Sequence, residues 1–206
     1  MSAGTEEPEA GGAATDKAGL RVRLRGVRRR LATEIPDAAE RATRRLPLSR
    51  FSRFRIVAAY HPRGSELDPW PVVEAILSVD PGFAQAALPV AVERDAPLRF
   101  RLWRPGDRLV PDAVGVPSPA RSAPEVSPNL VIAPLLAFDR KGGRLGQGGG
   151  HYDRTLANLR RDRPVFVLGL AYAGQEIDAV PTDRHDQRLD AVLTETAFIE
   201  VGGISR

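Results

Sequence analysis

The chain contains no cysteine, no long apolar run and only three histidines among its 206 residues. The absence of cysteine excludes disulfides and thiolate metal sites, and it fits a reducing cytosol. No stretch of about eighteen apolar residues occurs, so we expect no transmembrane helix. Three histidines without thiols also argue against a zinc enzyme. Because the N-terminus lacks the basic start and apolar core of a signal peptide, we expect a cytoplasmic protein.

The composition is otherwise that of a globular protein, with 42% hydrophobic and 27% charged residues. Residues 1–16 are rich in Gly, Ala and Glu, and their charged side chains are all acidic. We expect this segment to be a disordered tail. The remaining residues, 17–206, are long enough for one domain with a sizeable core.

Acidic residues are scarce in the block that follows the tail. Residues 17–55 carry thirteen Lys and Arg against three Asp and Glu, a net charge of +10, whereas the whole chain carries +4. Such a block is a candidate surface for phosphates or polyanions. An RNA-binding module is therefore an alternative, but Phe51, Phe54 and Tyr60 form no recognisable stacking motif.

An amphipathic helix is predicted from Lys17 to about Leu31. Its apolar side chains recur at spacings of four, three and four and form one packing stripe, namely Leu20, Leu24, Val27 and Leu31. The arginines between them are expected on a solvated basic face, namely Arg23, Arg25, Arg28 and Arg29.

Beyond this helix the chain alternates between strand-like and helix-like segments. Helices are predicted from Pro36 to about residue 46, over 71–77 and over 152–159. Strands are predicted over 56–60, 84–92, 98–103, 130–138, 165–172 and from 191, and residues 104–128 are expected to be a long loop. This order favours a three-layer, Rossmann-like α/β fold with a mostly parallel central sheet. In such folds ligands bind at the carboxyl ends of the strands.

The segment 133–154 joins an apolar strand to a helix through a glycine-rich turn. Four glycines lie within positions 146–150, which permits positive φ and close approach of a ligand to the backbone. N–H donors at a helix N-terminus suit phosphate, and Asp153 offers a carboxylate for a hard cation. No Gly-Lys-Ser/Thr follows, and the spacing is not G-x-G-x-x-G. On chemistry alone, a tight connection without a ligand is the alternative.

The string from Pro134 to Arg154, PLLAFDRKGGRLGQGGGHYDR, closely resembles the signature of 5-formyltetrahydrofolate cyclo-ligases, also called 5,10-methenyltetrahydrofolate synthetases. Further matches follow the family's order over residues 17 to 196: Lys17 to Arg21, residues 56–60 with Glu66, residues 168–172, Gln175, Pro181, His185-Asp186 and residues 190–195. The resemblance implies an enzyme that uses ATP and Mg²⁺ to convert 5-formyltetrahydrofolate into 5,10-methenyltetrahydrofolate, ADP and phosphate. The family's reaction proceeds by phosphorylation of the formyl oxygen.

The same resemblance implies roles for individual residues. Those expected to act in catalysis by neutralising phosphoryl charge are Lys17, Arg21 and Arg144. Those expected at ATP are Lys17, Arg21, Arg144, Leu145, Gly146, Gln147, Gly148, Gly149, Gly150, His151 and Tyr152. Those expected at the folate are His61, Glu66, Gln147, Gly148, Gly149, Gly150, His151 and Tyr152. The magnesium ligands are expected to be Asp153 and Asp186, with Asp190 as a competitor of Asp186.

Several of these residues also have a purely structural interpretation. Lys17 and Arg21 could belong to the solvated basic face, and Tyr152 could be a core residue. Asp153 could be a helix N-cap or an ion-pair partner, and Asp186 a turn residue. His61 could lie on a surface loop.

Two positions depart from the family pattern. Gln147 and His151 stand where tyrosines are common, and the resemblance implies that both positions line the folate side. A divergent member acting on another formamide or carboxylate, or a non-catalytic nucleotide-binding homologue, are therefore alternatives. We expect 5-formyltetrahydrofolate and ATP as ligands of a monomer, with no nucleic acid, membrane or obligate protein partner.

Overall fold

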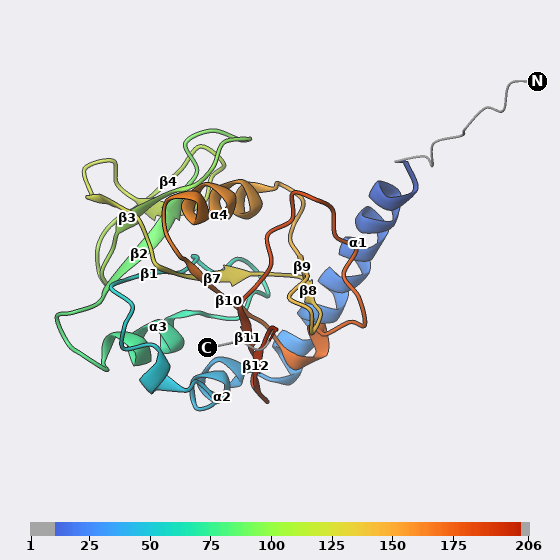
Figure 1. Ribbon diagram of the computed structural model, residues 1–206, viewed down its shortest axis with the longest axis horizontal. Helices are drawn as coiled ribbons and strands as arrows, with labels where there is room; N and C mark the ends of the chain where they lie inside the picture. Colours follow the sequence, from blue (N-terminus) through green and yellow to red (C-terminus); the bar gives the residue numbers. More distant parts are fainter. Residues whose placement is uncertain (1–10, 203–206) are drawn as a thin grey trace, which may run out of the picture.

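The computed structural model describes residues 11–202 (Figure 1). Helix α1 (Gly11–Glu34) starts earlier than the predicted Lys17 and so includes the last residues of the expected tail. Residues 1–10, the rest of that tail, lie outside the described part of the chain.

A central sheet of eight strands organises the molecule. Its order is β12-β11-β10-β7-β1-β2-β3-β6. The strand bounds are β1 Ile56–Ala58, β2 Gln85–Val90, β3 Arg99–Leu102, β6 Glu125–Val126, β7 Leu130–Pro134, β10 Phe166–Leu170, β11 Ala191–Leu193 and β12 Phe198–Glu200. The five inner strands from β11 to β2 run parallel, whereas β12, β3 and β6 pair antiparallel at the edges. The predicted mostly parallel sheet is confirmed.

Helices cover both faces of this sheet and give the three layers of the predicted α/β fold (Figure 1). Helices α2 (Ala38–Thr43) and α3 (Trp70–Leu77) pack with the C-terminal part of α1 against one face. Helix α4 (His151–Asp162) packs against the other face through Leu156. In β7, Leu130 and Ile132 face the first layer, and Val131 and Ala133 face the second. Burial on both faces explains why the inner strands are continuously apolar.

The expected long loop over 104–128 is wrong as a description of that region. It contains β6 and a separate two-stranded hairpin, β4 (Leu109–Pro111) and β5 (Pro117–Pro119). Asp112 stabilises the hairpin by accepting hydrogen bonds from the N–H groups of Val114 and Val116 and from Ala91 N. β4 and β5 contain prolines, which restrict them to a short ladder. Strands this short have no run of apolar residues that would predict them.

The predicted strand over 130–138 is also divided. β7 ends at Pro134, and β8 (Ala137–Phe138) leaves the sheet to pair with β9 (Arg144–Leu145). At the break, the Gln175 side chain donates to the carbonyls of Leu135 and Leu136, at 2.9 and 3.1 Å. Leu135 and Leu136 are buried, so the sequence stays apolar between β7 and β8 and gives no sign that the strand ends at Pro134.

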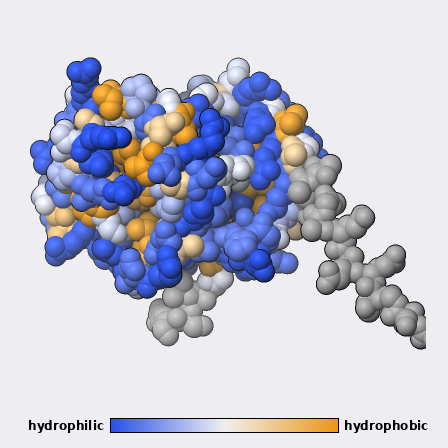
Figure 2. All heavy atoms as spheres, turned by 90° about the horizontal axis from the view of Figure 1, so that it is seen from above, coloured by the Kyte–Doolittle hydropathy of each residue, from blue (hydrophilic) through white to orange (hydrophobic). Residues whose placement is uncertain are grey.

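None of the helices within residues 11–202 is both long and apolar enough to cross a membrane. The face seen from above in Figure 2 is dominated by hydrophilic residues, with hydrophobic ones scattered among them. No broad apolar patch is visible on that face.

Candidate active site

A cavity of about 1020 Å³ opens at the carboxyl ends of three parallel strands. Tyr60 and His61 follow β1, Pro89 lies at the end of β2, and Pro134 and Leu135 mark the end of β7. This is the edge at which the sequence predicted a ligand site. The cavity is also lined by α1, by the start of α4 and by the loop before β11.

All of the residues to which the resemblance gave a catalytic, ATP, folate or metal role line this one cavity, apart from the competitor Asp190. They are Lys17, Arg21, His61, Glu66, Arg144, Leu145, Gly146, Gln147, Gly148, Gly149, Gly150, His151, Tyr152, Asp153 and Asp186. They come from segments far apart in the chain, so the fold brings together what the sequence separates. Their individual roles at a ligand stay predictions.

The glycine-rich turn, residues 146–150, links β9 to α4. Gly148 has φ +108° and Gly150 has φ +64°, conformations that side chains with a Cβ rarely adopt. Gly150 directly precedes the first residue of α4, so the turn lies at a helix N-terminus. Among the described residues, no acceptor pairs with the N–H groups of Gly148, Gly149 or Gly150. The turn therefore presents free donors at the positive end of a helix dipole.

Helix α1 contributes two cations to the cavity wall. The Lys17 ammonium lies 3.0 Å from Oδ2 of both Asp183 and Asp186. Partial burial lowers the pKa of Lys17, but the hydrogen bonds to Asp186 and Asp183 outweigh it, so this pKa is raised. Arg21 reaches the glycine turn, where its Nε donates to the carbonyl of Gly146 at 3.0 Å. Both residues therefore face the cavity rather than bulk solvent.

A further cation, Arg144, is the first residue of β9 and lies close to the glycine turn that follows the strand. Its side chain is only 3% exposed, and its Nη2 donates to Oδ1 of Asp153 at 2.6 Å. Its guanidinium also lies 5.7 Å from the centre of the Tyr152 ring, a cation–π distance. The ion-pair interpretation of Asp153 is therefore correct, and the residue lines the cavity as well.

The structure separates the two aspartates that compete for the metal role. Asp186 lies in the loop before β11 and lines the cavity. Asp190 instead accepts from Val167 N at 2.7 Å and from Arg160 Nη2 at 2.8 Å, in a different hollow at the amino ends of the strands. Only Asp186 shares a cavity with Asp153.

Among the side chains that the structure describes, no three from His, Cys, Asp or Glu cluster as a metal site. Mg²⁺ needs fewer protein ligands, because one or two carboxylates with water and substrate phosphates complete its shell. Described donors reach Oδ1 of Asp153 and Oδ2 of Asp186, and leave the second oxygen of each carboxylate free to bind a cation. The donor set of the cavity therefore fits a hydrated magnesium ion.

The wall at the ends of β1 and β7 carries Glu66 and two tyrosines. Burial, and then the charge of Glu66, raises the pKa of the Tyr60 and Tyr152 phenols, so both stay neutral donors. The Tyr60 hydroxyl donates to the Leu67 carbonyl. Together with Leu135 these side chains make an aromatic and apolar part of the cavity, which suits a flat ring ligand.

Gln147 in the turn and His151 at the start of α4, the two residues that depart from the family pattern, contact different elements. Gln147 accepts from Arg25 Nε of α1 at 3.0 Å. His151 contacts the carbonyl of Ala96, in the connection between β2 and β3, at 3.2 Å. Both line the cavity, and each is held by a different element.

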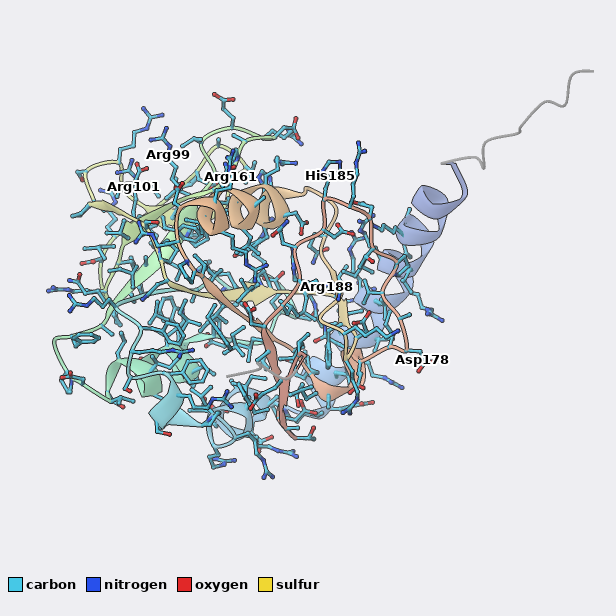
Figure 3. The ribbon with its side chains drawn as sticks, viewed as in Figure 1. Arg99, Arg101, Arg161, Asp178, His185 and Arg188 are labelled. Atoms are coloured by element: carbon cyan, nitrogen blue, oxygen red, sulfur yellow. The ribbon has the colours of Figure 1, made fainter. Side chains whose placement is uncertain are left out.

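The structure adds cavity residues that the sequence did not single out. Asp183 pairs with Lys17, and a hydrogen bond from His185 N, followed by Lys17, lowers the pKa of its carboxyl group. Figure 3 shows His185 in the same loop, between α1 and α4. Asp112 and Val116 of the β4–β5 hairpin also line the cavity. The acidic turn offered a signal for Asp183, whereas the loop interpretation of 104–128 concealed the hairpin.

One expectation about α1 is wrong. Arg28 is not part of the solvated basic face, because it is only 6% exposed. Its guanidinium contacts Glu66 and two other acceptors inside the protein. Arg23, Arg25 and Arg29 are exposed as expected.

Comparison with known proteins agrees with the geometry. The model of the 5-formyltetrahydrofolate cyclo-ligase family matches residues 13–195. The chain is 34% identical to the 5-formyltetrahydrofolate cyclo-ligase of Mycolicibacterium smegmatis over 68% of its length and 73% of that enzyme. It is 33% identical to the Escherichia coli K12 enzyme over 70% of its length and 80% of that enzyme.

A shorter alignment, with the Haemophilus influenzae 5-formyltetrahydrofolate cyclo-ligase, is 36% identical over 47% of this chain and 53% of that enzyme. Among solved structures, Aquifex aeolicus 5,10-methenyltetrahydrofolate synthetase superposes with a TM-score of 0.74 at 26% identity. That superposition covers 92% of this chain and 95% of the other. The chain therefore belongs to the 5-formyltetrahydrofolate cyclo-ligase family.

Proposed function

We propose that this protein converts 5-formyltetrahydrofolate, ATP and Mg²⁺ into 5,10-methenyltetrahydrofolate, ADP and phosphate. The observation that carries the proposal is the single cavity lined by every residue to which the resemblance gave a catalytic, ATP, folate or metal role. Its volume of about 1020 Å³ lies at the upper end of ligand pockets, as a site for two substrates requires. The active unit is proposed to be one domain, residues 17–206.

The charge pattern of the cavity supports a division between the two substrates. Lys17, Arg21 and Arg144 line the cavity with the free N–H groups of the glycine turn and would bind ATP phosphates. Arg144 also reaches the Tyr152 ring at the border of this side. Glu66 and Tyr152, with Tyr60 and Leu135, lie where a pteridine ring would bind. The formyl group would then lie between the two sides, next to the transferred phosphoryl group.

The reaction asks for positioning and charge neutralisation more than for a protein nucleophile. The formyl oxygen attacks the γ-phosphorus of ATP, and ADP departs with the electron pair of the broken P–O bond. N10 then attacks the formyl carbon, phosphate leaves with the former formyl oxygen, and N10 loses its proton. Lys17, Arg21 and Arg144 would neutralise the charge that spreads over the phosphoryl oxygens.

Asp153 and Asp186 would hold Mg²⁺, which when bound supplies charge stabilisation at the phosphate oxygens. Both carboxylates are paired with cations in the described structure, Asp153 with Arg144 and Asp186 with Lys17. We propose that ATP phosphates attract the two cations while the carboxylates turn to the metal. Such an exchange keeps the buried charges compensated before and after binding.

The test is turnover by the purified full chain. Methenyltetrahydrofolate should form, with its near-ultraviolet absorbance, only when 5-formyltetrahydrofolate, ATP and Mg²⁺ are all present. ADP and phosphate should appear in equal amounts with the product. Cyclisation without ATP, or ATP binding without turnover, would contradict the proposal, and the second outcome would identify a non-catalytic homologue.

A further inference from the structure

Arg28 places a charge inside the molecule, between the apolar residues Leu24 and Leu31 of α1. It follows Leu24 by four positions and precedes Leu31 by three, so it lies on the packing stripe of the helix. It is 6% exposed, and it does not line the cavity. An arginine at such a position needs partners that compensate its desolvation.

Three acceptors from two loops meet the Arg28 guanidinium. Its Nε donates to Ser65 Oγ at 3.2 Å, and its Nη1 donates to Glu66 Oε1 at 3.4 Å and to the Leu135 carbonyl at 3.2 Å. Ser65 and Glu66 belong to the loop after β1, and Leu135 follows β7. Arg28 therefore joins α1 to two of the three strand ends that line the cavity, those of β1 and β7.

Glu66 is held at both oxygens and still faces the cavity. Oε1 accepts from Arg28, and Oε2 accepts from the backbone N–H of Arg63 at 3.0 Å. Its side chain is 9% exposed, and it lines the cavity with Tyr152. Because Arg28 supplies the counter-charge from behind, the carboxylate needs no cation from the ligand. The acceptor capacity that the Glu66 carboxylate still has suits a neutral N–H donor, such as those of a pteridine ring.

We propose that Arg28 is a positioning residue, which holds the Glu66 carboxylate in the orientation that accepts hydrogen bonds from the folate substrate. The proposal rests on the proposed function of the cavity and names a residue behind its wall. Arg28 does not line the cavity, so it acts on folate only through the groups that it holds, and the charged group among them is Glu66. ATP binds on the other side of the cavity and should be insensitive to it.

A double-mutant cycle tests this dependence with Arg28→Met, Glu66→Gln and the double variant. Turnover is measured as kcat and as separate KM values for 5-formyltetrahydrofolate and ATP, and folate binding is measured by calorimetry. Arg28→Met should lower kcat/KM for the folate about 10²-fold, the usual cost of a displaced binding group. The KM for ATP should change less than about twofold. In the Glu66→Gln background, Arg28→Met should change both folate readouts by less than about threefold, because the two residues act as one unit.

Arg29→Met is the matched control, because it makes the same substitution at the exposed neighbouring position, and it should leave all constants unchanged. Thermal unfolding accompanies each variant. Arg28→Met leaves Glu66 buried without its partner, whereas the double variant removes both charges and should recover stability. The double variant therefore keeps the cycle measurable if the single variant folds poorly.

The outcomes separate the two proposals. If Arg28→Met has the same effect in the wild-type and in the Glu66→Gln background, so that the two effects multiply, the positioning role is wrong. An equal change in the KM for ATP would also overturn it. If the wild type binds folate without turnover, the proposed function fails. The double-mutant cycle, measured as dissociation constants for folate, then still decides the role of Arg28. If the wild type binds no folate, both proposals fail.

Discussion

The two faces of α1 carry the same kinds of side chain in different surroundings. On one face, Lys17, Arg21 and Arg28 reach the cavity or the interior, and each has a partner in a segment far away in the sequence. On the other, Arg23 and Arg29 are exposed. The difference teaches that position on the helix, not charge, decides which basic side chains reach the cavity or the interior and which lie in solvent.

Substitutions on the two faces should therefore differ most in turnover. Lys17→Ala and Arg21→Ala should each lower turnover by about 10²–10³-fold, the usual effect of removing one donor that stabilises charge in the transition state. Arg29→Ala should leave it unchanged. The three variants are compared in the same cyclisation assay.

Arg25 is a less suitable control than Arg29, because its Nε contacts Gln147 of the glycine turn. Equal and small effects at Lys17, Arg21 and Arg29 would show that the whole helix surface is a solvated face. In that case the comparison between the two faces would carry no functional meaning.

The glycines of α1 and of the turn extend the comparison to the backbone. Gly150→Ala should cost about 1–2 kcal/mol of folding free energy, because its φ of +64° disfavours any Cβ, and it should raise the KM for ATP. An added Cβ would also meet Arg154 Nη1 at 2.6 Å.

Gly19→Ala is the matched control, since nothing lies within 4 Å of its added Cβ and the residue is helical. It should stabilise the protein by up to about 1 kcal/mol and leave ATP binding unchanged. Chemical denaturation and ATP titration measure both variants. A Gly150→Ala variant with normal ATP affinity would show that the turn is only a tight connection.

Asp186 and Asp190 lie at opposite ends of the parallel strands, so substitutions at the two aspartates compare these two ends. Asp186→Asn should raise the Mg²⁺ concentration needed for half-maximal turnover, because it removes a charged oxygen from a cation site. Asp190→Asn should mainly lower stability, since that carboxylate holds Val167 N and Arg160. Magnesium titrations and thermal unfolding separate the two effects. A shifted Mg²⁺ requirement in Asp190→Asn alone would reverse the assignment.

Much of the site could be predicted because short motifs carry it. The glycine turn, Lys17 to Arg21 and the acidic turn each hold several candidate residues in one stretch, and the fold only has to bring a few stretches together. Arg28 could not be predicted in this way. Hydropathy assigns an arginine to the solvent, and its partners Glu66 and Leu135 are joined to it only by the tertiary structure.

The fold shows the same limit. The parallel strands were predicted because burial on both faces makes them continuously apolar. The break between β7 and β8 was not predicted, because Leu135 and Leu136 would be buried whether the strand continued or ended there. Gln175, which donates to their carbonyls, lies far along the chain. The hairpin of β4 and β5 depends on Asp112 binding backbone N–H groups, which no periodicity signals.

The smallest expected effects lie at Gln147 and His151, the two positions that depart from the family pattern. Gln147→Tyr removes the contact with Arg25 next to the cations of α1, whereas His151→Tyr changes the wall near Ala96. Because the two side chains contact different elements, the single variants should separate. We expect His151→Tyr to change the KM for the folate by a few-fold and to leave the KM for ATP unaltered. Gln147→Tyr, at the border between the two faces of α1, should change both constants slightly. Steady-state titrations of each substrate decide the matter, and a change confined to ATP in His151→Tyr would place that residue on the nucleotide side.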